Sequence, residues 1–251
     1  MILYLYALAD GIERVEDATG VCGETPMVLP LPHCALVAGW IDAAPAIDRN
    51  ALTRQDVLVR HVHEIARAAL PMRFGTTAAS IDAATRAIEG LGTAVRERLN
   101  LVAGREQMTV RIAGPPSRPE AASARSRRSS PETERAEADA SRASDPSKAR
   151  HASGALGTVG DGTRYLERRA GRELPDGIRE LLQALEPLAR ATRVEPGLRS
   201  GVTTAYQLID RGTADRHRKL IEEIAAQHPA LRVRASGPLP PYAFADLGRP
   251  R

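Results

Sequence analysis

The first positions of the chain alternate with the two-residue period that is typical of a β-strand. Within Ile2–Leu8, the side chains of Tyr4 and Tyr6 would lie on one face of the strand and those of Leu3 and Leu5 on the other. The run CALVAGWI at 34–41 predicts a second strand. Residues 11–32 contain glycines, prolines and acidic residues, so we interpret them mainly as a loop.

A period of three to four residues predicts two helices in the first hundred positions. The first helix would begin near Thr53 as its N-cap and end at Pro71, whose ring disfavours helical geometry in the residue before it. The second would begin after Ser80 and stop near Gly104. Their apolar positions recur at helical spacing: Leu58, Val62, Ile65 and Ala69 in the first, and Ile81, Ala84, Ile88, Leu91, Val95, Leu99 and Val102 in the second.

Beyond residue 106 the pattern changes repeatedly between the strand period and the helix period. Strands are predicted at 107–112, 193–195, 202–210 and 231–235. One helix is predicted near 162–172; it would break around Pro175 and continue to Leu185. Another helix is predicted at 213–228. The order strand, helix, strand, strand, helix, strand is that of the ferredoxin-like βαββαβ arrangement. Alternation places Arg111, Arg232 and Arg234 on the outer face of the sheet.

These patterns predict an α+β protein of two domains. The N-terminal α+β domain would span 1–105, the ferredoxin-like domain 106–236, and a Pro-rich tail 237–251. Residues 114–155 contain no large apolar side chain and cannot bury enough apolar surface to offset the entropy of ordering. We therefore expect a long disordered insertion at 114–158, directly after the first strand of the second domain.

Composition narrows the class of protein. Of the 251 residues 43% are hydrophobic and only 3% aromatic, so the cores must rest on aliphatic side chains. The net charge is +4, too small to require a nucleic-acid partner, although basic residues outnumber acidic ones by 16 to 12 in 159–251. The two cysteines predict no disulfide framework, and the opening MILYLYALADG lacks the basic region of a signal peptide. We expect a cytoplasmic protein without a membrane segment.

Candidate catalytic and metal-binding patterns are weak. On a helix, His61 and His63 of the run HVHE would point to different sides, which argues against a metal site. Cys34 and His33 are neighbours in a predicted strand and would face opposite ways, so we favour a core cysteine over a reactive thiol. Glycine-rich phosphate loops and nucleophile elbows are absent from the sequence. We predict no catalytic residue, no cofactor and no metal.

An RNA-binding module is the alternative function. A ferredoxin-like sheet with arginines on its open face is similar to an RNA-recognition motif, which stacks bases on aromatic side chains of its two central strands. Here those strands offer only Tyr206, and TTAYQLID does not match the expected aromatic–glycine pattern.

Two short stretches stand out because they hold both phenylalanines of the chain. In LPMRFGT at 70–76, we expect Arg73 at a seam between elements, bonded to carbonyls at helix ends or to Glu64. In SGPLPPYAF at 236–244, the prolines favour an extended path, and Tyr242 and Phe244 would point the same way as buried anchors.

Together the two stretches resemble motifs of the gas-vesicle accessory proteins F and L. That family looks like LP[LM]RFGT after a helix in its first half and GPWPPYSF at its end. The opening YLYAL, RYLERR at 164–169 and HPALRVRASGP at 228–238 are weaker similarities. The matching positions are Leu70, Pro71, Met72, Arg73, Phe74, Gly75 and Thr76 in the first motif, and Gly237, Pro238, Pro240, Pro241, Tyr242 and Phe244 in the second, with Leu239 where the family usually has tryptophan.

The resemblance implies a non-enzymatic role in building gas vesicles, which are hollow, protein-walled flotation organelles. Members of the family are minor components that are thought to bind the small hydrophobic shell protein and one another, and to keep the shell protein from aggregating. The implied partners are therefore the shell protein and other gas-vesicle accessory proteins, with no nucleic acid and no membrane. The implied location is the cytoplasm and the gas vesicle.

Overall fold

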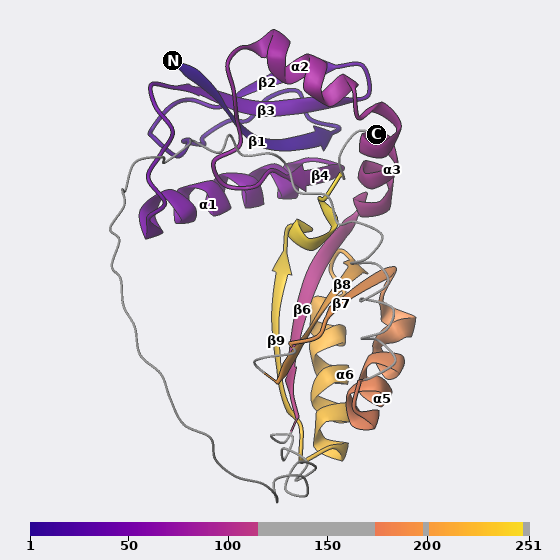
Figure 1. Ribbon diagram of the computed structural model, residues 1–251. Helices are drawn as coiled ribbons and strands as arrows, with labels where there is room; N and C mark the ends of the chain where they lie inside the picture. The colour runs from indigo at the N-terminus through magenta and orange to yellow at the C-terminus, as the bar shows by residue number, and fades with distance from the viewer. Residues whose placement is uncertain (115–173, 198–200, 248–251) are drawn as a thin grey trace, which may run out of the picture.

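Two antiparallel sheets with helices packed on them make up the fold (Figure 1). The computed structural model describes residues 1–114, 174–197 and 201–247. The predicted insertion at 114–158, apart from Gly114, and the predicted helix near 162–172 lie outside the described residues. Within the described ranges, no helix is both long enough and apolar enough to cross a membrane.

The first sheet has its long N-terminal strand buried on both faces. The strand order is β2-β3-β1-β4, with β5 also paired to β1. Tyr4 and Tyr6 of β1 belong to one core and Leu3 and Leu5 to the other, which confirms the predicted facing of the strand. The strands are β1 (Ile2–Asp10), β2 (Met27–Leu31), β3 (Cys34–Ile41), β4 (Ala68–Pro71) and β5 (Thr77–Ala78).

Strand β2 corrects the prediction that residues 11–32 are mainly loop. It forms a hairpin with β3, in which Leu31 pairs with Cys34 across a two-residue turn. Pro30 made the run unpromising as a strand, but β2 lies at the edge of the sheet, where a proline does not remove a ladder hydrogen bond.

Helix α1 (Arg49–Ile65) begins and ends earlier than predicted. Its N-cap is Asp48, whose Oδ1 accepts a hydrogen bond from the amide of Ala51 at 2.8 Å, and not Thr53. The helix stops at Ile65, so Pro71 does not end it; the apolar run AALP forms β4, which pairs with β1 and is fully buried. A short apolar run of this kind fits a buried strand and a helix equally well by periodicity alone.

The predicted second helix is two helices, α2 (Ile81–Glu89) and α3 (Gly92–Val102). The predicted cap is confirmed, since Ser80 Oγ accepts from the amide of Ala83 at 3.1 Å. The chain bends at Gly90 and Leu91, where the glycine lowers the helical preference and lets the two segments pack separately on the sheet.

The second sheet has the order β7-β8-β6-β9, and all its pairings are antiparallel. Its elements are β6 (Arg105–Ala113), α5 (Asp176–Leu185), the short 3-10 turn η1 (Glu186–Leu188), β7 (Ala191–Glu195), β8 (Val202–Asp210), α6 (Ala214–Gln227) and β9 (Arg232–Leu239). Helices α5 and α6 lie on one face of the sheet (Figure 1), and their leucines and isoleucines pack there with Val110, Ile112 and Ala205.

Strand β9 is longer than the predicted strand at 231–235. It continues through Gly237 and Pro238 to Leu239, which pairs with Gln107 of β6. The predicted tail at 237–251 therefore begins inside a strand. The following Tyr242–Phe244 forms a 3-10 turn, η2, rather than an extended segment.

Candidate interaction site

The two motif stretches meet where the N-terminal and C-terminal halves join. Leu70 of β4 and Phe244 of η2 belong to the same buried cluster, and Leu208 of the second sheet belongs to it too. Because this cluster also contains leucines of β1 and α3, one continuous apolar core runs from the first sheet to the second. We call this region the junction: residues 70–76, residues 237–247 and the side chains that hold them.

Residues 70–76 are shaped by two polar side chains of the first core. Tyr4 donates its hydroxyl hydrogen to Gln55 Oε1 at 2.5 Å and accepts the amide hydrogen of Gly75 at 2.8 Å. Gln55 in turn donates to the carbonyl of Met72 at 3.1 Å. Gly75 has a φ of +80°, a conformation that favours glycine. The conformation of the turn after β4 is therefore held by hydrogen bonds from the side chains of Tyr4 and Gln55.

Phe74 completes this packing on the apolar side of the turn. Its ring meets the ring of Tyr4 edge-on, with the centroids 6.2 Å apart. This geometry is one that aromatic pairs prefer. Phe74 is therefore an anchor of the turn rather than a free surface residue.

Arg73 does not lie in a buried seam, and that prediction is wrong. Its side chain is 69% exposed, and its Nη2 lies 3.9 Å from Oδ2 of Asp246. Successive side chains alternate in direction along this extended run. Met72 and Phe74 are therefore half-buried, and Arg73 between them points to the surface. An exposed pair at this distance contributes little to stability.

The C-terminal stretch is held by hydrogen bonds from four elements. Gln107 of β6 accepts from the amide of Ala243 at 2.8 Å, and Arg193 of β7 donates to the carbonyl of Ala243 at 3.2 Å. Arg60 of α1 donates to the carbonyl of Pro238 at 3.4 Å, and Arg218 of α6 to the carbonyl of Gly237 at 2.8 Å.

Gly237 is required by its surroundings. Its φ is +131°, and a Cβ at this position would lie 2.7 Å from both the carbonyl oxygen of Gln107 and the sulfur of Met108. Any other residue would push β9 away from β6.

The predicted burial of the two aromatic anchors is confirmed for Phe244 and only partly met by Tyr242. Phe244 is 6% exposed, whereas Tyr242 is 37% exposed. In the 3-10 turn the two rings do not point the same way, which corrects the extended-chain prediction. Tyr242 lies along α1, where its hydroxyl donates to Asp56, and burial beside that carboxylate raises the pKa of Tyr242.

A second group of contacts joins the halves at the end of α1. Arg211, just after β8, donates to the carbonyl of His63 at 2.5 Å and to the carbonyl of Ala66 at 3.2 Å. These carbonyls belong to the last turn of α1, which has no further helical partner for them. The amide of Gly104 also donates to the carbonyl of Arg67 at 3.0 Å.

Four side chains form many of the hydrogen bonds that hold the junction, and none of them was predicted from the sequence: Gln55, Gln107, Arg193 and Arg211. A buried glutamine in an otherwise apolar helix stripe was a usable signal for Gln55. The other three act through main-chain atoms far away in the sequence, so no local pattern indicates their role.

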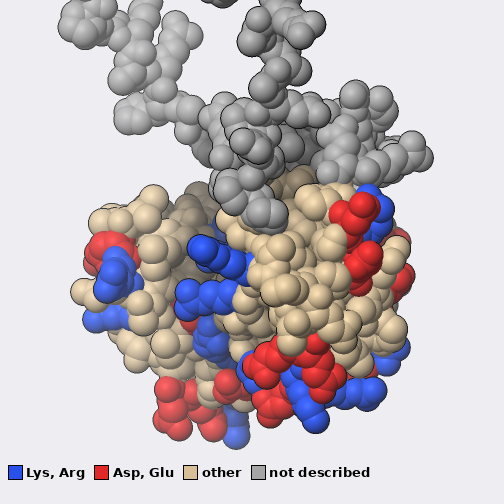
Figure 2. All heavy atoms as spheres, turned by 90° about the horizontal axis from the view of Figure 1, so that it is seen from below, with Lys and Arg blue, Asp and Glu red and all other residues tan. Residues whose placement is uncertain are grey.

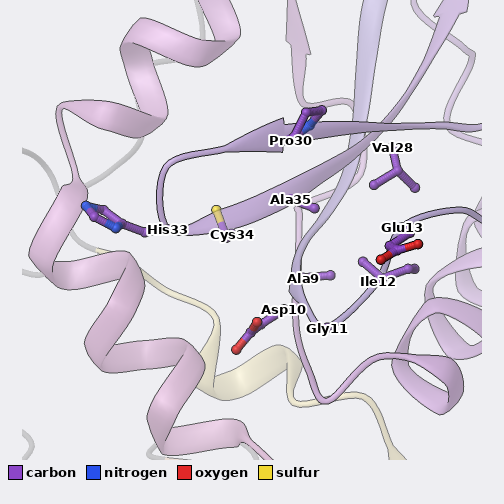
Figure 3. A pocket seen from close by; sticks show the side chains of 10 residues that line it. All are labelled: Ala9, Asp10, Gly11, Ile12, Glu13, Val28, Pro30, His33, Cys34 and Ala35. Atoms are coloured by element: carbon purple, nitrogen blue, oxygen red, sulfur yellow. The ribbon is translucent and has the colours of Figure 1, made fainter.

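A separate pocket of about 380 Å³ opens at one end of the first sheet (Figure 3). It is lined by Ala9, Asp10, Gly11, Ile12, Glu13, Val28, Pro30, His33, Cys34 and Ala35. Burial raises the pKa of the Cys34 thiol to about 11, so the thiol is protonated near neutral pH. The ring of His33 lies 3.0 Å from Arg96, and Asp10 pairs with Arg67. The pocket therefore does not join an activated thiol to a base.

The histidines of HVHE do not form a metal site in the structure. His63 is buried against Arg211, and His61 lies half-buried. Across residues 1–114, 174–197 and 201–247, no group of three His, Cys, Asp or Glu side chains is placed to hold a metal ion.

The comparison with family models identifies one family. The family model described as "Gas vesicle synthesis protein GvpL/GvpF" matches residues 2–246. The fold is similar to the crystal structure of the gas vesicle protein GvpF from Anabaena sp. PCC7120, with a TM-score of 0.66 and 17% identity over 97% of this chain and 95% of that one. It is also similar to GvpF from Microcystis aeruginosa, with a TM-score of 0.66 and 16% identity over 97% and 98% of the two chains. No curated protein sequence matches. The chain belongs to the GvpL/GvpF family of gas vesicle synthesis proteins.

Proposed function

We propose that this protein is a non-enzymatic accessory protein of gas vesicle assembly. It binds the hydrophobic shell protein and other accessory proteins, and it limits aggregation of the shell protein before assembly. The observation that carries this proposal is the family match, which covers 2–246 and so includes both sheets and both motifs. Membership in a family of gas vesicle synthesis proteins supports a role in vesicle formation, and the partners are our inference.

We also propose a division into domains that suits this role. The N-terminal α+β domain spans 1–105, a ferredoxin-like domain spans 106–236, and residues 237–251 form a C-terminal segment. The antiparallel order β7-β8-β6-β9 with two helices on one face supports the ferredoxin-like class for the second domain. The shared cluster at the junction would hold the two domains in one orientation.

A hydrophobic partner needs apolar side chains that the fold leaves uncovered, and residues 47–57, which include the first half of α1, supply them. Ile47 is 82% exposed, and Val57 is 61% exposed. Ile47 also lines a shallow hollow of about 430 Å³ together with Leu52. We propose this stretch as the contact for the shell protein, because burial of such side chains is worth on the order of 2 kcal/mol each.

The proposal is tested with the purified chain and the shell protein from the same cell. The shell protein is diluted out of denaturant with or without an equimolar amount of the chain, and the fraction that stays in the supernatant is measured, followed by a pull-down. We expect the chain to keep the shell protein soluble and to retain it. The double variant Ile47→Ser/Val57→Ser should lose most of this effect, and Ile81→Ser, at an exposed isoleucine of α2, should not.

Two results would contradict the proposal at different levels. If the parent chain neither retains the shell protein nor reduces its sedimentation, binding of the shell protein is wrong. If the parent works and the double variant works equally well, the proposed contact on α1 is wrong, whereas the accessory role stands.

A further inference from the structure

The second sheet has one face that α5 and α6 do not cover, and its side chains lie in rows across the four strands. The pairing places Arg193, Tyr206, Thr109 and Ser236 in one row. The next row is Glu195, Thr204, Arg111 and Arg234, and Arg232 follows two residues further along β9. The prediction that Arg111, Arg232 and Arg234 point outward is confirmed, because all three are exposed.

Arg111 and Arg234 lie directly opposite each other in the register of β6 and β9. Like charges at directly opposite positions of an antiparallel pair destabilise a sheet. The guanidinium groups of Arg111, Arg232 and Arg234 form no hydrogen bond or ion pair with another described residue. Three cations therefore lie close together, and none of them forms an ion pair with a described residue.

The protein's own C-terminal turn covers only the other end of this face. There Gln107 is 3% exposed and bonds the amide of Ala243, and Arg193 bonds the carbonyl of the same residue. The end of the face that bears Arg111, Arg232 and Arg234 is not occupied by any described element. Figure 2, seen from below, shows Lys and Arg side chains gathered in a hollow at this end of the molecule.

Charge complementarity indicates an anionic occupant, and the remaining chemistry favours a protein over RNA. Tyr206 is the only aromatic side chain in the rows of this face, and its hydroxyl donates to Glu195 at 3.0 Å. A single ring is a poor platform for stacked bases. A carboxylate-bearing peptide needs no stacking surface.

The spacing of the arginines fits carboxylates in regular secondary structure. Arg232 and Arg234 are two residues apart on a strand, which places them roughly 7 Å apart, and Arg111 lies across from Arg234 at about 5 Å. Acidic side chains at alternate positions of a strand, or four apart on a helix, have similar separations. A guanidinium group binds a carboxylate with two parallel hydrogen bonds. Such a contact is therefore specific in its geometry and is also stabilised by charge.

We propose that Arg111, Arg232 and Arg234, placed together on the open face of the second sheet, dock an acidic segment of a partner protein. This surface is separate from the apolar contact on α1, and its partner is defined by carboxylates rather than by apolar side chains. The inference does not rest on binding of the shell protein. Carboxylates of such a partner relieve the repulsion between Arg111 and Arg234.

The test measures binding by fluorescence anisotropy with two named probes, a labelled poly-glutamate peptide and an oligouridylate of the same formal charge. The variant Arg111→Gln/Arg232→Gln/Arg234→Gln is compared with Arg49→Gln/Arg86→Gln/Arg216→Gln, which loses the same charge from exposed arginines elsewhere. We expect the parent to bind the peptide, the first variant to lose about tenfold or more of this affinity, as happens when several ion pairs are removed, and the control variant to bind like the parent.

Thermal unfolding of the same variants provides the second measurement. Because the three arginines repel one another and bond no described residue, we expect the first variant to unfold at the same temperature as the parent or at a higher one. A clearly lower unfolding temperature for it, and for Arg232→Gln alone, would show that the arginines stabilise the fold and would overturn the inference. Equal loss of binding in both variants, tighter binding of the oligouridylate than of the peptide, or no binding of either probe would overturn it as well.

Discussion

The hydroxyl of Tyr242 donates a hydrogen bond to Oδ1 of Asp56 at 3.0 Å, and it joins the end of the chain to the first long helix. Two residues further along, Phe244 enters the core that the two sheets share. The C-terminal motif thus has a surface contact through Tyr242 and a buried contact through Phe244, and we expect them to contribute differently to stability.

The buried contact should dominate the stability of the junction. Phe244→Ala removes a ring from a packed cluster, so we expect the free energy of unfolding to fall by about 3–4 kcal/mol. Tyr242→Phe removes only the hydrogen bond to the partly exposed Asp56, so a loss below about 1 kcal/mol is expected. Urea unfolding monitored by circular dichroism measures both. Equal losses for the two variants would show that Phe244 is not a core residue in solution.

Arg73 is conspicuous in the family motif, yet the structure predicts a small effect of its removal. Its side chain is largely exposed, and its pairing with Asp246 is long, so Arg73→Ala should lower the free energy of unfolding by less than about 0.5 kcal/mol. Any functional loss in this variant would then reflect a contact with a partner. A drop of several kcal/mol in the same unfolding experiment would show that Arg73 is buried in solution, as the sequence first suggested.

Arg211 should matter for how the two halves are held together. Arg211→Ala leaves the carbonyls of His63 and Ala66 without their partner at a buried helix end, which costs about 1–3 kcal/mol. The matched control is Arg216→Ala, an exposed arginine of α6, for which no change is expected. Hydrogen exchange provides the local measurement, because the last turn of α1 should lose protection in the first variant only.

His63 should make the fold less stable in mild acid. Burial of its ring, with Arg211 and Arg60 nearby, lowers the pKa of His63 to about 4, whereas an unfolded histidine titrates near 6.5. Between these values the unfolded chain binds the extra proton, so the free energy of unfolding decreases as the pH falls from about 6.5 to about 4, by roughly 1.4 kcal/mol per pH unit and about 3 kcal/mol in total. Below about 4 this contribution stays constant.

His63→Gln tests this assignment, because it removes the titrating group while the carbonyl of residue 63 remains. The slope of stability against pH between 6.5 and 4 should become smaller in this variant. Some slope should remain, since burial also lowers the pKa of His217. An unchanged slope would show that the His63 ring is accessible to protons in the folded protein.

Much of the fold could be predicted from hydrophobic periodicity, and the errors have physical causes. The strands predicted at 34–41 and 202–210 have the bounds that the structure shows. The start of α1 was placed too late because Thr53 was taken as the N-cap, although Asp48 is also a favourable N-cap residue and is the one used. The strand β4 was taken for the end of a helix because AALP has no period of its own, and pairing with β1 decides its conformation.

The candidate site was predictable only in its sequence motifs. LPMRFGT and GPLPPYAF were recognisable as a pair, and the structure brings Leu70 and Phe244 into one cluster. The groups that position these motifs, such as Gln107 and Arg193, are brought there by strand pairing over long sequence distances. The continuation of β9 through Pro238 also depends on its position at the edge of the sheet, which a local pattern does not contain.

The central claim, a role in gas vesicle assembly, is tested most directly in a cell that forms gas vesicles and carries this gene. The coding sequence is deleted, and gas vesicles are counted by electron microscopy in the deletion strain and in strains that express the parent chain or Ile47→Ser/Val57→Ser. The account predicts few or no vesicles after deletion, recovery with the parent chain, and poor recovery with the double variant at equal protein level. Normal numbers of vesicles in the deletion strain would contradict the account.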